Sequence, residues 1–187
     1  MTPPGTLVLA SASPQRRAIL TQVGIPFEVK VSGVDEETQG DPEWLALENA
    51  RRKALAIDAP GLVLGADTDV AFEGEILGKP RDEAHARELI GRLAGNTHEV
   101  FGAIALAQDG EITHTAVEVT RVHFRPLSAG QVDWYVSTGE WQGRAGAYAI
   151  QGVGAALVAG LEGDYLNVVG LPLARLLDLA PGLLPAA

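Results

Sequence analysis

The chain has no cysteine, so disulfide bonds, cysteine nucleophiles and zinc sites with thiolate ligands are all excluded. It has no apolar run of the roughly 20 residues that a membrane span requires. Its first residues, MTPPGTLVLA, lack the basic segment and the long apolar region of a signal peptide. We therefore expect a soluble cytoplasmic protein without a membrane partner.

Positive charge is also scarce, because the only lysines are Lys30, Lys53 and Lys79 and the net charge is −10. This balance argues against broad nucleic-acid binding. It does not exclude a small anionic ligand, since charges farther away than about 8 Å are largely screened at physiological salt. A phosphate-binding protein of this composition needs its few cations gathered in one cleft, and a metal ion there would help.

The length of 187 residues and the apolar content of 47% fit a single domain over residues 1–187 with a sizeable core. Apolar runs and alternating patterns predict strands near 7–10, 27–31, 62–64, 97–107 and 112–124. Caps and apolar periodicity predict helices near 14–24, 41–57, 82–93, 129–137 and 168–179. This mixture of crossovers and hairpins predicts an α/β domain with a mixed sheet.

The stretch VLGADTDVAFEGEILGKP, residues 63–80, carries the first candidate site. We expect the strand over Leu62–Leu64 to end at the small residues that follow and to present Asp67 and Asp69 in a turn. Asp67 would then hold a divalent ion or activate a water, and Lys79 would hold a phosphate. The alternative is an ordinary Asp-rich turn after a buried strand.

A second candidate lies where the first strand leads into the first helix. Ser13 is a good N-cap, Pro14 suits the first helical position, and Ser11 adds a hydroxyl donor. Arg16 and Arg17 lie in the first turn, where a cation is unfavourable unless an anion offsets it. This pattern favours a phosphate site; the alternative is a capped surface helix with solvated arginines.

Three further segments contain candidate polar groups. Glu36 lies in an acidic loop that is either metal-ligating or simply solvated, and Lys53 near a helix end suits the helix dipole. Arg144 and Gln151 lie in a glycine-rich segment, where a glutamine amide could read a base edge. The alternative for that segment is a glycine-rich strand pair packed under a helix.

Several common motifs are missing. Gly74–Pro80 has one residue too few for a P-loop and a proline where Ser or Thr is required. The chain has no complete dinucleotide fingerprint, no metal-binding histidine spacing and no Gly-x-Ser-x-Gly elbow.

Taken together, these stretches resemble the Maf family of nucleoside triphosphate pyrophosphatases. Three blocks carry the resemblance, in the family's order and over almost the whole chain: LASASPQRRAIL at 9–20, GADT with GEILGKP at 65–80, and RAGAYAIQG at 144–152 with GDYLNVVGLP behind it. The resemblance implies a mixed, curved sheet with flanking helices and two lobes around a central cleft. It also implies hydrolysis of a nucleoside triphosphate to the monophosphate and pyrophosphate with a divalent metal, Mg²⁺ or Mn²⁺, and it suggests a homodimer.

The resemblance assigns functional positions residue by residue. Those that match the family's functional positions are Ser11, Arg16, Glu36, Lys53, Asp67 and Lys79. We expect Glu36 and Asp67 to hold the metal, Asp67 to activate water as well, and Arg16, Lys53, Lys79 and the turn with Ser11 and Ser13 to hold phosphates. The AGAYAIQG block is similar to the branch that acts on dTTP and UTP, in which Thr68 and Gln151 match positions tied to base choice.

Two residues depart from that branch. Gln15 stands where the first Arg of an Arg-Arg pair is usual, and a neutral amide cannot supply the charge of a guanidinium. This bears on base preference, toward other or modified pyrimidines, more than on hydrolysis. Arg144 stands where lysine is more usual. Two other functions stay open: a nucleotide-binding regulator of cell division or septum formation with little turnover, and a phosphatase of small phosphate esters.

Overall fold

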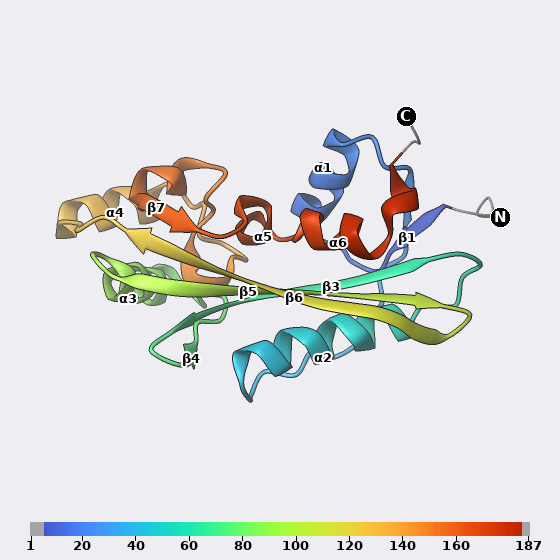
Figure 1. Cartoon of the computed structure of the whole chain (residues 1–187). Coiled ribbons are helices and arrows are strands. Elements are labelled where there is room, and N and C mark those ends of the chain that lie inside the picture. The colour runs from blue at the N-terminus through green and yellow to red at the C-terminus, as the bar shows by residue number, and fades with distance from the viewer. Residues whose placement is uncertain (1–5, 185–187) are drawn as a thin grey trace.

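The computed structural model describes residues 6–184, which form a mixed seven-stranded sheet with helices on both faces (Figure 1). The strand order is β2-β1-β3-β5-β6-β7, and β4 pairs with β3 outside this path. β1 (Leu7–Leu9) runs parallel to β2 (Phe27–Val29) and β3 (Val63–Phe72), and every other pair is antiparallel. The predicted α/β fold with a mixed sheet and flanking helices is confirmed.

The other strands are β4 (Glu75–Ile76), β5 (Thr97–Gln108), β6 (Glu111–Phe124) and β7 (Val158–Glu162). The α-helices are α1 (Pro14–Gln22), α2 (Pro42–Leu55), α3 (Glu83–Leu93), α4 (Ala129–Ser137), α5 (Tyr165–Val169) and α6 (Leu173–Leu179). Three short 3₁₀ helices complete the set: η1 (Ala145–Ala147), η2 (Val153–Leu157) and η3 (Pro181–Leu183). Within residues 6–184, no helix combines the length and the apolar character needed to span a bilayer.

Local chemistry explains where the helices that carry the site begin. The Ser13 side chain accepts a hydrogen bond from the Arg16 N–H at the start of α1, and the Asp41 side chain accepts from the N–H groups of Glu43 and Trp44 at the start of α2. A proline follows each cap at the first helical position, where its missing N–H costs nothing. The predicted starts of both helices are therefore confirmed.

The two faces of the sheet have different side chains. Small residues of β1, β3 and β5 pack against the alanines of α2, so this helix lies very close to the sheet. Leucine and isoleucine side chains of the same strands, such as Leu9 and Ile104, point to the other face and pack against α1 and α6. A third cluster, built around α3, α4 and the segment with η1 and η2, forms the core at the other end of the hairpin of β5 and β6 (Figure 1).

One edge of β3 is left open in the middle of its length. β1 pairs with β3 only at Val63 and Leu64, and β4 pairs with it only at Ala71 and Phe72. Among the strands of residues 6–184, none covers the part of β3 between these pairings on that side. The residues between them include Asp67, Thr68 and Asp69. Asp67 contacts Lys53 and Asn49 of α2 on one face, and Thr68 contacts Arg16 of α1 on the other.

The expectation that the strand ends at Gly65 and Ala66 is wrong. β3 continues through Asp67 and Asp69 to Phe72, and β5 pairs with it along this length. The glycine serves packing instead, since a Cβ atom at Gly65 would lie 2.1 Å from the carbonyl oxygen of Ala50 in α2. Asp67 is therefore fixed on a central strand rather than held in a turn.

The expected helix over 168–179 is two helices. α5 ends at Val169 and α6 begins at Leu173, and Gly170 between them has a φ of 137°, outside the helical region. Pro172, expected inside the first turn of one helix, instead caps the start of α6. The break leaves the Gly170 carbonyl oxygen free to accept hydrogen bonds from side chains.

Gly65→Ala should lower the free energy of unfolding by about 3 kcal/mol, because its methyl group overlaps the α2 backbone and the helix must move. Gly91→Ala is the matched control, since nothing lies within 4 Å of a Cβ added at this position in α3. It should be neutral or stabilise by up to about 1 kcal/mol. Urea unfolding measures both, and equal stability of the two variants would show that α2 does not require the glycine.

Candidate active site

A cleft of about 750 Å³ lies against the open edge of β3. Its walls come from the turn between β1 and α1, the loop before α2, the loop after β4 and the segment that contains η1. All eleven side chains that the sequence predicted for a site line this cleft: Ser11, Ser13, Gln15, Arg16, Glu36, Lys53, Asp67, Thr68, Lys79, Arg144 and Gln151. Segments that are remote in the sequence therefore meet at one place.

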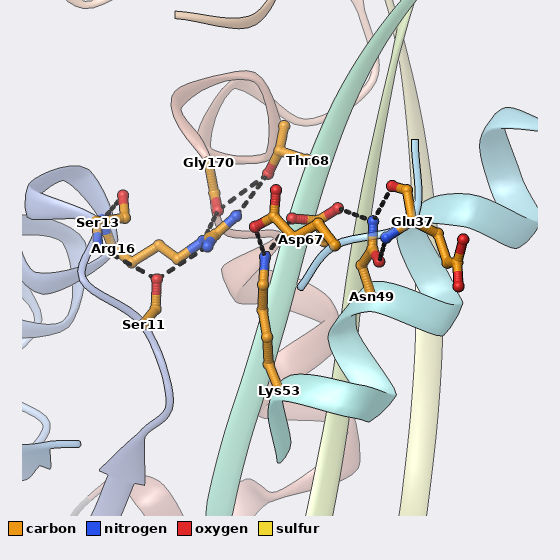
Figure 2. A network of polar contacts seen from close by, with 10 residues as sticks. Ser11, Ser13, Arg16, Glu37, Asn49, Lys53, Asp67, Thr68 and Gly170 are labelled. Atoms are coloured by element: carbon orange, nitrogen blue, oxygen red, sulfur yellow. Dashed lines mark hydrogen bonds and ion pairs between the residues drawn. The ribbon is translucent and has the colours of Figure 1, made fainter. Parts of the chain in front are cut away.

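Arg16 turns back from α1 into the cleft and is 8% exposed. Its Nη1 donates to Ser11 Oγ at 2.9 Å, its Nε to the Gly170 carbonyl at 2.9 Å and its Nη2 to Thr68 Oγ1 at 3.2 Å (Figure 2). Burial lowers the pKa of Arg16, and the charges of Asp67, Glu36 and Asp69 oppose that effect. The alternative of a solvated surface arginine is wrong for Arg16, whose guanidinium is held in one orientation.

Arg17 does not join this group. It is exposed, and its Nη2 donates to the Ala12 carbonyl at 2.9 Å. Gln15 lies at the cleft, where its Oε1 accepts a hydrogen bond of 3.2 Å from the Ser13 hydroxyl. The first turn of α1 thus supplies one charged and one neutral side chain to the cleft.

Lys53 bridges the two predicted acidic residues. Its Nζ lies 2.6 Å from Glu36 Oε1 and 2.6 Å from Asp67 Oδ1. Although Lys53 is in the last turn of α2, its side chain is only 9% exposed and points to the sheet, so a surface interaction with the helix dipole does not describe it. Burial alone would raise the pKa of Glu36, but the hydrogen bond and charge of Lys53, and then the charges of Lys79 and Arg16, lower it.

Two glutamates of the acidic loop before α2 have partners on different sides of the helix. Glu36 points into the cleft, whereas the Glu37 carboxylate pairs with Arg52 on the outer side of α2. The backbone of Glu37 is fixed by Asn49, whose Oδ1 accepts from the Glu37 N–H at 2.8 Å and whose Nδ2 donates to its carbonyl at 3.0 Å. The loop is therefore not merely solvated, because α2 positions it.

Asn49 is a site residue that the sequence analysis missed. It is 2% exposed, and its Nδ2 also donates to Asp67 Oδ2 at 3.2 Å (Figure 2). Together with Lys53 it gives each oxygen of the Asp67 carboxylate a donor. The available signal was a polar pair four residues apart on a helix face that otherwise carries Ala46 and Ala50.

Asp69 also lines the cleft. Its Oδ2 is buried and has no hydrogen-bond partner within residues 6–184. Burial, followed by the charges of Asp67 and Glu36, raises the pKa of Asp69 to about 7 against the opposing charges of Lys53 and Arg16. Both effects favour the protonated carboxyl of Asp69 more than at an exposed aspartate.

The opposite wall carries Lys79, Arg144 and Gln151. The Gly146 N–H donates to the Leu77 carbonyl at 3.0 Å and to the Gly78 carbonyl at 3.2 Å, which ties the segment of Arg144 to the loop of Lys79. Lys79 is exposed, and Arg144 is half-buried. This wall therefore adds two cations, Lys79 and Arg144, to a cleft that also contains Arg16 and Lys53.

The donor set suits a magnesium-like cation. Among residues 6–184, no three or more His, Asp or Glu side chains are grouped to hold a metal ion on their own. Mg²⁺ does not need such a group, because it is usually bound through one or two carboxylates, waters and substrate phosphates. The carboxylate oxygens of Glu36 and Asp67, and the unpartnered oxygen of Asp69 on the same strand, fit that pattern.

Comparison with known proteins gives one consistent result. A family model described as Maf-like protein matches residues 6–182. A dTTP/UTP pyrophosphatase of Symbiobacterium thermophilum is 51% identical over 92% of this chain and 91% of its own length. Proteins of the same name from Salmonella typhimurium (47% identical; 93% and 91% covered) and Anaeromyxobacter sp. (46% identical; 92% and 87% covered) are also similar.

Lys53→Met should lower the free energy of unfolding by roughly 3 kcal/mol, because Asp67 would stay buried without its cation. Arg52→Met is the neighbouring control: Arg52 makes two ion pairs, with Glu37 and Glu48, but is 40% exposed, so its loss should cost less than about 1 kcal/mol. Urea unfolding at pH 7 compares them. Equal losses would contradict the importance of the buried pair.

Proposed function

The chain belongs to the Maf family, and on that premise we propose that it is a nucleoside triphosphate pyrophosphatase that converts dTTP or UTP to the monophosphate and pyrophosphate. One observation carries the proposal: Arg16, Lys53 and Lys79 meet Asp67 and Glu36 in a single cleft of an acidic protein. The triphosphate brings about four negative charges, and phosphoryl transfer requires their neutralisation and a water placed in line.

The cations and hydroxyls of the cleft bind the triphosphate in this mechanism. Arg16, with the turn of Ser11 and Ser13, holds phosphate oxygens from one wall, and Lys79 holds them from the other. Lys53 stands between Glu36 and Asp67 and offers its remaining hydrogen-bond donor to the substrate. Glu36 and Asp67 would hold a divalent cation, which when bound supplies further neutralisation of phosphate charge.

Asp67 acts as the general base. A water oxygen attacks the α-phosphorus, its proton passes to the Asp67 carboxylate, and the bond from the α-phosphorus to the bridging oxygen breaks to release pyrophosphate. Lys53 and Asn49 each donate to one oxygen of Asp67 and so fix the orientation of the carboxylate. Asp67 lies on β3, which is paired with β5 along this length, so the backbone that carries the base is held rigidly.

Base recognition falls to the neutral polar groups of the cleft. Thr68 and Gln151 are the residues we assign to the pyrimidine, and the neutral Gln15 and the charged Arg144 line the same cleft. Gln15 lacks the charge of the arginine usual in related enzymes, and we propose that this widens acceptance toward modified pyrimidines. The cytoplasm, where these nucleotides are used, is the proposed compartment, and the homodimer stays a prediction.

A product assay over a panel of nucleotides tests the proposal. With Mg²⁺ or Mn²⁺, we expect pyrophosphate from dTTP, UTP and 5-substituted pyrimidine triphosphates, less from dCTP, and least from GTP and methylated GTP. EDTA should abolish release, because the metal neutralises the phosphates. Orthophosphate as the product would indicate a phosphatase of phosphate esters, and tight binding without product would indicate a regulator; either result contradicts the proposal.

Asp67→Asn should reduce kcat for dTTP by about 10²- to 10⁴-fold while substrate still binds, because an amide cannot accept the proton. The matched control is Asp109→Asn in the turn between β5 and β6, where Asp109 has a φ of 52° that asparagine also adopts readily. It should keep full activity. If Asp67→Asn turns over at a rate near that of the unaltered protein, Asp67 is not the base.

A further inference from the structure

The segment from Ala149 to Gly154 presents Gln151 to the cleft between two anchored ends. Gln151 is exposed and lines the cleft, whereas Ala149 and Ile150 before it are buried, as is Gly154 after it. An exposed amide on a flexible loop would lose much conformational entropy on binding a base. The contacts of the neighbouring backbone therefore decide how well Gln151 is positioned.

A carboxylate outside the cleft holds the far end of this segment. Glu140 Oε1 accepts from the Val153 N–H at 2.8 Å, and Oε2 accepts from the Gly154 N–H at 2.8 Å. Hydrogen bonds to a charged acceptor are stronger than neutral ones, and two on successive residues fix the chain direction as well as its place. A Cβ atom at Gly152 would lie 1.9 Å from Glu140 Oε1, so the carboxylate also packs directly against the residue after Gln151.

The near end is held through a tyrosine hydroxyl. Tyr135 is fully buried in the core, and its hydroxyl donates to Glu140 Oε2 at 3.1 Å and accepts from the Ala149 N–H at 3.3 Å. The two ends of the segment thus share one hub, formed by Glu140 and Tyr135. Gln151 lies between the anchored amides, two residues from both Ala149 and Val153.

The backbone around Glu140 is held in place by hydrogen bonds to the end of α4. The Glu140 N–H donates to Thr138 Oγ1 at 3.2 Å, directly after the end of α4. The next residue, Trp141, is 7% exposed, and its Nε1 donates to the Val136 carbonyl at 3.0 Å. Glu140 is thus fixed from both sides along the chain, and it is not among the residues of the described chain that line the cleft.

We propose that Glu140 is a positioning residue for base recognition, which holds the loop of Gln151 in the conformation that reads the pyrimidine. The proposal rests on the proposed function, because the role of Gln151 belongs to it. Glu140 acts through Gln151 rather than by touching the nucleotide. Its removal should therefore impair the choice between bases, while hydrolysis at the phosphates continues.

Glu140→Gln and Gln151→Ala, singly and together, test this in a double-mutant cycle on the full chain. A glutamine at 140 has one acceptor oxygen in place of two, so one backbone amide loses its partner. We expect Glu140→Gln to raise KM for dTTP about tenfold and to reduce the preference for dTTP over dCTP about tenfold, with kcat little changed. In the Gln151→Ala background it should have no further effect on that preference.

Two additional variants complete the design. Glu111→Gln, at an exposed end of β6, is the control and should leave both constants unchanged. Tyr135→Phe removes the hydroxyl that joins Glu140 to Ala149 and should reduce the same preference by a smaller factor. This variant keeps the test decisive if Glu140→Gln does not fold, since an unaltered preference in Tyr135→Phe would then overturn the proposal.

The outcomes separate the two proposals. If the unaltered protein releases pyrophosphate but the losses at 140 and 151 are additive, or fall equally on kcat for every nucleotide, Glu140 has only a structural role and the pyrophosphatase function stands. If the unaltered protein releases no pyrophosphate from any nucleotide, both proposals fail. Non-additive losses confined to KM and base preference support the positioning role.

Discussion

The buried contact between the Lys53 ammonium and the Asp67 carboxylate is the interaction on which the cleft depends. Without the cation, Asp67 would face Glu36 and Asp69 as one of three acids in a confined space. The lining contains four basic residues (Arg16, Lys53, Lys79 and Arg144) and four acidic ones (Glu36, Glu37, Asp67 and Asp69), so their formal charges cancel. The net charge of −10 therefore comes from residues outside the cleft. Salt screens the repulsion between those distant acidic residues and an anion that enters the cleft.

This contact requires α2 to lie close to the sheet. Lys53 and Asn49 reach Asp67 because α2 packs through alanines onto a face made of alanine, valine and Gly65. A larger side chain at these positions would move the helix axis outward and lengthen both bonds to the carboxylate. The shortness of β1 is the complementary feature, since a longer β1 would pair with β3 beyond Leu64 and close the edge at which the cleft forms. Packing and chemistry therefore constrain the same few residues.

Local signals predicted the parts of the fold that local chemistry determines. The caps and prolines of α1 and α2, and the hairpin of β5 and β6, follow from residues that contact one another along the chain.

The continuation of β3 was missed because small residues can mark either a strand end or a close contact with another element. Here Gly65 is small because the backbone of α2 lies against it, and a local pattern cannot distinguish the two cases. The role of Asn49 was missed for a similar reason: its partners, Asp67 and the backbone of Glu37, are distant in sequence or in another element. The eleven residues predicted for the site line the cleft, whereas Arg17, part of the same first-turn pattern, does not. Resemblance contributed Glu36 and Lys53, because residue chemistry alone favoured a solvated loop for Glu36 and a helix-dipole role for Lys53.

The geometry of Arg16 shows how the same side chain can support the fold and still bind substrate. A guanidinium has five N–H donors in a fixed plane. Three of them are used by Ser11, Gly170 and Thr68, one from each nitrogen. Two remain, one on each terminal nitrogen, so Arg16 keeps donors that a phosphate can accept. Because Thr68 is one of the fixed partners and also donates to Gly170, the residue assigned to base choice and the residue assigned to phosphate are held in one network. A lysine at position 16 has only three donors, too few to bond Ser11, Gly170 and Thr68 and also a phosphate. Its flexible ammonium group would also not fix the phosphates relative to Gly170 as a planar guanidinium can.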